Sequence, residues 1–171
     1  RYSKVFIYSA IAALLLLAGT AIFNISSPSN SEVLFNKYFQ VYPDVTVHKR
    51  GVSQNSRLTD AMDYYNQKQF QKASGIFMTI IKKSNNETAV FYNGISLMAI
   101  NHNNQALKYF IQICNDTENS FYNEANWYAA LSLIAVNKTG EAKKYLKKLT
   151  NSYDYKDAAK DILKQLTNPK K

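Results

Sequence analysis

The chain reads AVFYNGISLMAIN over residues 89–101 and ANWYAALSLIAVN over residues 125–137. Alanine, tyrosine, serine, leucine and asparagine recur at the same places in the two stretches, at a constant offset of 36 residues. A period between about 20 and 50 residues is typical of stacked repeats, in which each unit buries its apolar face against its neighbours. The duplication therefore predicts a repeat array and not a single closed core.

The match continues beyond the quoted stretches, since Ala106 aligns with Ala142. Apolar residues recur at helical spacing in both halves of each copy. Asn101 and its counterpart Asn137 separate the halves, and asparagine tolerates the left-handed backbone conformation that ends a helix. Each copy is therefore predicted to fold as a helix, a tight turn and a second helix.

A third copy precedes these two, because Ala61, Tyr64, Ala73 and Phe77 have the same spacings. The pattern is a small residue, an aromatic three positions later, and Ala-x3-Phe in the second helix. The second copy has Gly94, Leu97, Ala106 and Phe110, with leucine in place of the aromatic. The last copy has Ala130, Leu133, Ala142 and Leu146, and fits less fully, since leucine also replaces the phenylalanine. This pattern resembles the tetratricopeptide repeat family, over about residues 55–150. The resemblance implies antiparallel helix pairs.

The predicted fold is all-α, with about three tetratricopeptide-like helix pairs between an N-terminal helix (31–41) and a C-terminal capping helix near 153–166. The expected divisions are a transmembrane anchor (1–25), a linker with a short helix and an extended loop (26–56), three repeats (57–150), and the capping helix and tail (151–171). The repeated positions should form the core: Ala61, Tyr64, Ala73, Phe77, Ile80, Gly94, Leu97, Ala106, Phe110, Ile113, Ala130, Leu133, Ala142, Leu146 and Leu149.

Residues 5–23 contain no charged side chain. Nineteen helical residues at about 1.5 Å each span roughly the 30 Å hydrocarbon core of a bilayer. A cleaved signal peptide is the alternative, but its apolar region is usually shorter, about 7–15 residues. Arg1 and Lys4 precede the span, and basic flanks stay in the cytoplasm. We therefore expect a single-pass protein of the inner membrane with its repeats in the periplasm.

The linker carries Pro28 and a serine, Ser31, that can cap the helix predicted to end before Pro43. Thr46 and its neighbours are expected to be extended, and residues 51–56 to form a loop. The run FNKYFQVYP over residues 35–43 and the later Arg50-Gly51 resemble membrane-anchored periplasmic tetratricopeptide-like proteins of Bacteroidota. Some of those proteins carry a cytoplasmic part resembling an anti-sigma factor.

Net charge is +9, from 21 lysines and arginines against 12 acidic residues. Only three of the basic residues are arginine, and no nucleic-acid reading motif is present, so we expect no nucleic-acid partner. Residues 138–171 hold ten lysines against four acidic residues. That segment is interpreted either as a solubilising cap or as a basic face for an acidic partner or anionic lipid.

Residues that could carry catalysis are sparse. His48 and His102 have no second ligand at metal spacing. Cys114, the only cysteine, rules out an intramolecular disulfide. No nucleophile has an adjacent base, and no glycine-rich phosphate loop occurs. The sequence therefore predicts no enzyme, no cofactor and no small-molecule substrate.

Two hypotheses for the function follow from the repeats. The first is a membrane-anchored adaptor that binds a protein segment on its concave face. The second is a permanent structural subunit of a larger membrane or envelope assembly, with the extracytoplasmic part of an anti-sigma-like regulator as a further alternative. The side chains expected to line the concave face are Met62, Tyr65, Phe91, Ile95, Met98, Trp127, Leu131 and Ile134. That face is either open to a partner or filled by the chain's own aromatic segment, residues 33–42.

Overall fold

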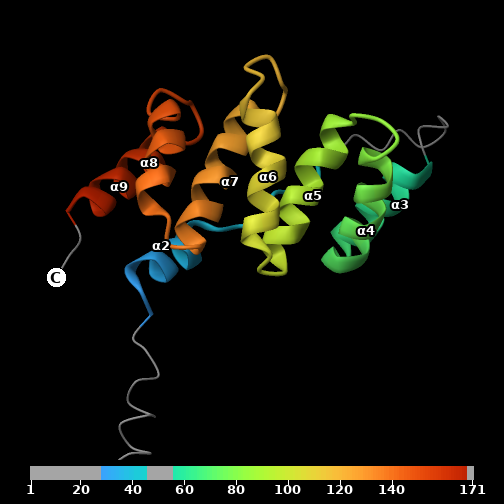
Figure 1. The fold of residues 1–171 in the computed structure, drawn as a ribbon, viewed down its shortest axis with the longest axis horizontal. Helices are drawn as coiled ribbons and strands as arrows, with labels where there is room; N and C mark the ends of the chain where they lie inside the picture. Colours follow the sequence, from blue (N-terminus) through green and yellow to red (C-terminus); the bar gives the residue numbers. More distant parts are fainter. Residues whose placement is uncertain (1–27, 46–55, 169–171) are drawn as a thin grey trace, which may run out of the picture.

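A computed structural model of the chain describes residues 28–45 and 56–168 (Figure 1). These residues form helices and no strand, which confirms the all-α prediction. The helices are α2 (Asn30–Tyr38), α3 (Ser56–Asn66), α4 (Phe70–Ile81), α5 (Glu87–Ala99), α6 (Asn103–Cys114), α7 (Tyr122–Ala135), α8 (Thr139–Lys148) and α9 (Lys156–Thr167).

Six of the helices form three consecutive pairs, α3 with α4, α5 with α6, and α7 with α8. The second helix of each of the first two pairs also packs on the first helix of the next pair, so the pairs stack in one row (Figure 1). α9 packs on α8 at the end of the row, and α2 packs on α7. The arrangement is that of a helical repeat array with an N-terminal and a C-terminal helix, as the duplication predicted.

The turn inside each pair has the same backbone geometry. Lys68, Asn101 and Asn137 have φ values of 59°, 62° and 60°, in the left-handed region. At the middle turn, Asn101 N–H donates to the carbonyl of Met98, and the next N–H donates to the carbonyl of Leu97. This bond pair is the Schellman motif, which satisfies carbonyls at a helix end. The left-handed conformation expected at the two asparagines is confirmed, and Lys68 adopts it in the first pair.

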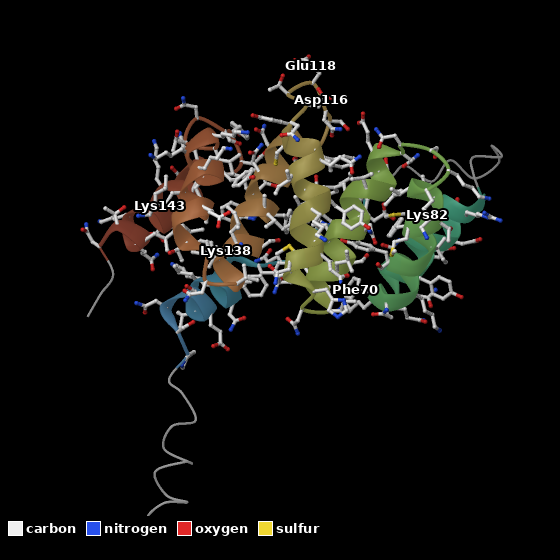
Figure 2. All side chains as sticks on the ribbon, viewed as in Figure 1. Phe70, Lys82, Asp116, Glu118, Lys138 and Lys143 are labelled. Atoms are coloured by element: carbon white, nitrogen blue, oxygen red, sulfur yellow. The ribbon has the colours of Figure 1, made fainter. Side chains whose placement is uncertain are left out.

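The turns inside pairs and the loops between pairs lie along opposite edges of the array. Figure 2 shows Phe70 and Lys138, which follow two of the left-handed turns, near one edge. Asp116 and Glu118, in the loop between α6 and α7, lie at the other edge. This alternation is what antiparallel helix pairs joined by short turns require.

Nearly all of the predicted core positions are buried. Tyr64 is the exception and that prediction is wrong: its ring is half-buried at the surface, where the Lys72 ammonium lies 5.3 Å from its centroid. Helices α5 and α6 approach each other closely at Gly94. A Cβ added to Gly94 would lie 2.6 Å from Cε1 of Phe110, a ring that is fully buried. Gly94 is therefore the residue that lets these helices pack closely.

The N-terminal helix differs from its expected bounds. Ser29, and not Ser31, is the N-cap, since its Oγ accepts the backbone N–H of Glu32 at 3.1 Å. The helix ends at Tyr38 rather than near residue 41, because the chain is extended from Phe39. The capping helix α9 likewise begins at Lys156, slightly later than expected.

Several predictions lie outside the described residues. These are the transmembrane span at residues 5–23 and the extended and loop segments between residues 46 and 55, including His48. Within the two described ranges, no helix has the length and apolar character needed to cross a bilayer.

Gly94→Ala should destabilise the fold by about 1–3 kcal/mol, because the added methyl group overlaps the Phe110 ring. Gly75→Ala is the matched control, since Gly75 also lies in a helix interior but has nothing within 4 Å of an added Cβ. That control should stabilise by roughly 0.5–1 kcal/mol, from helix propensity alone. Urea unfolding of both variants measures the difference, and a loss that Phe110→Leu does not partly reverse would contradict the packing described here.

Candidate functional site: the tyrosine face and the N-terminal segment

The middle helices α5 and α7 are buried around their whole circumference. Every residue from 91 to 98 and from 125 to 134 is buried. A helix that is covered on all sides needs neighbours on all sides. The second helices of the pairs cover one side of this row. The chain's own residues 30–45, here called the N-terminal segment, cover another side and pass behind α7 toward α5 in Figure 1.

The helical half of this segment is α2, which is anchored by apolar side chains. Leu34 and Phe35 are buried. The Tyr38 ring meets the Trp127 indole edge-on, with centroids 6.0 Å apart. The indole in turn stacks on Tyr155, just before α9, with centroids 5.2 Å apart. Trp127 thus joins the N-terminal segment to the C-terminal cap.

Polar contacts fix both ends of α2. Ser31 Oγ donates to Asn137 Oδ1 at 2.8 Å, at the left-handed turn between α7 and α8. At the other end, the Tyr38 hydroxyl donates to the Asp161 carboxylate, and the Lys37 ammonium lies 3.2 Å from the same oxygen. The hydrogen bonds from Tyr38 and then Lys37 lower the pKa of Asp161. The ion pair is half-exposed, so it contributes little to stability.

The extended half, residues 39–45, is held through its main chain by three tyrosines, one from each helix pair. Tyr128 on α7 donates its hydroxyl to the carbonyl of Gln40 at 2.7 Å, and Tyr65 on α3 donates to that of Tyr42. Tyr92 on α5 donates to the carbonyl of Pro43 at 2.9 Å and accepts the N–H of Val45 at 3.0 Å. We call Tyr65, Tyr92 and Tyr128 the tyrosine face.

One side chain of the extended half enters an aromatic cluster. The Tyr42 ring meets Phe91, Tyr92 and Tyr128 at centroid distances of 5.0, 6.2 and 6.3 Å, with its plane steeply inclined to each. Such edge-to-face pairs add about 0.5–1.5 kcal/mol each beyond the area they bury. Tyr42 is therefore the central side-chain anchor of the extended half.

Two more side chains of the extended half contact the array. Phe39 meets the Tyr128 ring edge-on at 6.4 Å and stacks on Phe35 at 4.9 Å. Asp44 accepts a hydrogen bond of 2.8 Å from the Asn66 amide at the end of α3. The extended half therefore runs from α7 at its beginning to α3 at its end, across all three pairs.

Burial keeps the hydroxyls of the tyrosine face protonated. It raises the pKa of Tyr92 to about 12 and also raises the pKa of Tyr65 and of Tyr128. Since the hydroxyls act as donors to carbonyl oxygens, protonation is the state that these contacts need. The protonated hydroxyls hold the main chain of the extended half as hydrogen-bond donors.

All eight residues predicted to line the concave face are buried. Tyr65, Phe91 and Trp127 contact the N-terminal segment directly, through the hydrogen bond and ring pairs given above. The other five belong to the apolar core: Met62, Ile95, Met98, Leu131 and Ile134. The prediction missed Tyr92 and Tyr128, which make the central hydrogen bonds. A sequence signal for them was present, because Tyr92 and Tyr128 occupy the same position in the two repeated stretches, residues 89–101 and 125–137.

The residues considered for metal or nucleophilic chemistry form no site in the described part of the chain. No group of three or more histidine, cysteine or acidic residues there is placed to hold a metal ion. Burial raises the pKa of the Cys114 thiol to about 12, which keeps it protonated at neutral pH.

Some of the C-terminal lysines have partners within the chain. Lys148 lies over the Tyr122 and Tyr145 rings, at 5.3 and 5.8 Å from their centroids. Lys138 pairs with Glu141 at 3.7 Å. Figure 2 shows Lys138 near α2 and Lys143 on α8. Lys143 and Lys148 belong to α8, and Lys138 immediately precedes it.

Trp127→Ala should lower the free energy of unfolding by about 3–5 kcal/mol, because the indole is only 6% exposed and links α2 to α9. Hydrogen exchange of amides in α2 should accelerate more than exchange in α4, which the indole does not contact. Tyr153→Ala is the control, since Tyr153 is 99% exposed, and it should melt like the wild type. Unchanged stability of Trp127→Ala would mean that the N-terminal segment is not held by this ring.

Alkaline pH should destabilise the fold. Because burial raises the tyrosine pKa values above their ordinary value of 10.0, the folded chain keeps protons that the unfolded chain releases. The contribution of these tyrosines to stability is fully retained below about pH 10 and is lost as the pH rises from there toward 12; the buried Cys114 thiol adds a loss in the same direction that begins near pH 9. Urea unfolding followed by near-ultraviolet circular dichroism measures this slope. Tyr92→Phe should reduce it by up to about 1.4 kcal/mol per pH unit, and an unchanged slope would contradict the prediction.

No family model matches the sequence, and no curated protein matches it. Function is therefore inferred from the tyrosine face and the segment that it holds.

Proposed function

We propose that this chain is a non-enzymatic helical-repeat scaffold whose first helices, α3, α5 and α7, bind an extended segment of a partner protein. One observation carries the proposal: three tyrosine hydroxyls, one from each helix pair, bind main-chain groups of a single extended segment. Main-chain contacts of this kind give affinity for a peptide, while nearby side-chain pockets give specificity.

The proposal includes the remaining predictions from the sequence. The helix pairs are of the tetratricopeptide type, and residues 5–23 tether them to the inner membrane, with the repeats in the periplasm. The left-handed turns at equivalent positions and the close approach at Gly94 support the repeat type. Tethering would confine the scaffold to partners at the membrane surface.

A permanent structural subunit is less well supported. A permanent interface is broad and apolar before assembly. In the described ranges, the exposed large apolar side chains are few: Val33, Val41 and Val45 lie in the N-terminal segment, Met78 on α4 and Tyr153 before α9. So small a set does not make the broad apolar surface that a permanent interface presents before assembly.

A photo-crosslinking amino acid at Asn66 tests the proposal in cell membranes. Because residues 39–45 already cover the tyrosine face, the probe must lie on the array and not on that segment. Asn66 ends α3, is exposed, and donates to Asp44 of the extended half, so a probe there lies beside any chain that occupies the face. Met78 on α4 is the control, because it is also exposed but lies on a second helix of a pair. We expect a discrete adduct with another protein from position 66 and none from position 78. Equal labelling from both positions, or no adduct from position 66, contradicts the proposal.

A further inference from the structure

The two halves of the N-terminal segment are held very differently. In α2, Leu34 and Phe35 are only 4% and 9% exposed. In the extended half, Val45 is 54% exposed, Pro43 is exposed, and the anchoring ring of Tyr42 is only half-buried. The extended half thus covers the array without being buried itself, so less of its own apolar surface holds it in place.

The main-chain contacts of the extended half are ones that any extended peptide offers. The three hydroxyls bind carbonyl oxygens of consecutive or nearby residues, and one accepts an N–H. Nothing in those four bonds depends on which side chains the peptide carries. Another extended chain in the same direction and register could satisfy the same hydroxyls.

The side-chain contacts define the chemistry that such a chain needs. The ring of Tyr42 fits among Phe91, Tyr92 and Tyr128. An aromatic residue three positions earlier meets Tyr128, and a carboxylate two positions later accepts from Asn66. Proline between the tyrosine and the carboxylate has no N–H to leave unsatisfied and restricts the chain to the extended conformation.

From these contacts we propose that residues 39–45 are a built-in competitor for a partner segment of the same chemistry. The partner segment is extended and carries an aromatic residue, two further residues, then tyrosine, proline and an acidic residue. It displaces residues 39–45 while α2 remains packed on α7. This inference rests on the proposed function and adds the kind of segment that is bound and the means by which binding is limited.

The exchange replaces one occupant by another and does not leave the face empty. Phe91 and Tyr92 are fully buried beneath the extended half, and the tyrosine hydroxyls would lose their main-chain partners if it simply left. A tethered competitor acts at an effective concentration on the order of millimolar. A partner segment of equal intrinsic affinity therefore binds only when it is locally abundant, as it is when both proteins are confined to one membrane.

A peptide competition experiment tests the inference on the full chain in detergent micelles. The probe is a fluorescent peptide that copies residues 39–45, FQVYPDV, and its affinity is measured by anisotropy. Tyr42→Ala in the chain weakens the built-in competitor but leaves the tyrosine face intact. We expect the peptide to bind this variant at least about tenfold more tightly than the wild type, because the occupied fraction of the face falls.

Three controls accompany the measurement. Tyr153→Ala, at a fully exposed ring, should bind the peptide like the wild type. Adding Tyr92→Phe to Tyr42→Ala should weaken binding on the order of tenfold, since two hydrogen bonds to the peptide are lost. A peptide with alanine in place of its tyrosine should bind neither chain. Near-ultraviolet circular dichroism confirms that each variant is folded.

Equal peptide affinity for the wild type and for a folded Tyr42→Ala chain would overturn the inference, as would absence of binding to either. So would a wild-type dimer whose formation reduces peptide binding, because a second copy's residues 39–45 would then be the occupant. If position 66 crosslinks a partner while the peptide affinities are equal, the proposed function stands and the competitor does not. If the Tyr42→Ala chain binds the peptide more tightly but position 66 crosslinks no partner, residues 39–45 are displaceable, but the partner-binding function fails and the role of competitor fails with it.

Discussion

The structure depends on two helices, α5 and α7, that are buried around their full circumference. Amphipathic helices of a repeat array need cover on one side only, but these helices have buried residues at every position from 91 to 98 and from 125 to 134. Three stacked pairs cover part of that surface, and the remainder requires a further element. The N-terminal segment supplies it, which is why a nine-residue helix and a short extended chain pack against an array that comes later in the sequence.

The extended half of this segment brings main-chain polar groups to an apolar face, and the tyrosines form hydrogen bonds with them. An extended chain has carbonyl and N–H groups that no neighbouring strand satisfies, and laying it on an apolar face removes water from some of them. An unsatisfied buried polar group costs about 1–3 kcal/mol. Tyr65, Tyr92 and Tyr128 place a hydroxyl at the end of a ring, so the same side chain contributes apolar area to the core and a donor to the covering chain. Phenylalanine at these positions would keep the area and lose the donor.

Much of the fold could be predicted from the repeat itself. The 36-residue offset gave the stacked pairs, and asparagine at residues 101 and 137 marked two of the three left-handed turns. Lys68 could not be identified in the same way, because lysine carries no local preference for that conformation and adopts it where the packing of the pair requires it. Similarly, Ser29 and Ser31 are both acceptable caps by residue type, and tertiary contacts decide between them: Ser31 bonds to Asn137.

The face that holds the N-terminal segment was predictable in part, and the missing part has a geometric reason. Helical periodicity assigned Phe91 and Trp127 to the inner face, and both contact the N-terminal segment. Tyr92 and Tyr128 come one position later, about 100° further around the helix. A chain that covers a helix contacts a stripe at least about 100° wide, so the predicted positions 91 and 127 and the following positions 92 and 128 all take part.

Where an extended chain docks has no periodic signature, because its position is set by contacts between residues far apart in sequence. Sequence alone therefore left the open and self-filled states of the face undecided. In the structure the choice depends on the ring of Tyr42 and the hydroxyls beneath it. The hydroxyl contacts are independent of side-chain identity, and the contacts of Tyr42 and Asp44 are not, so these two residues give the segment its fixed register on the face.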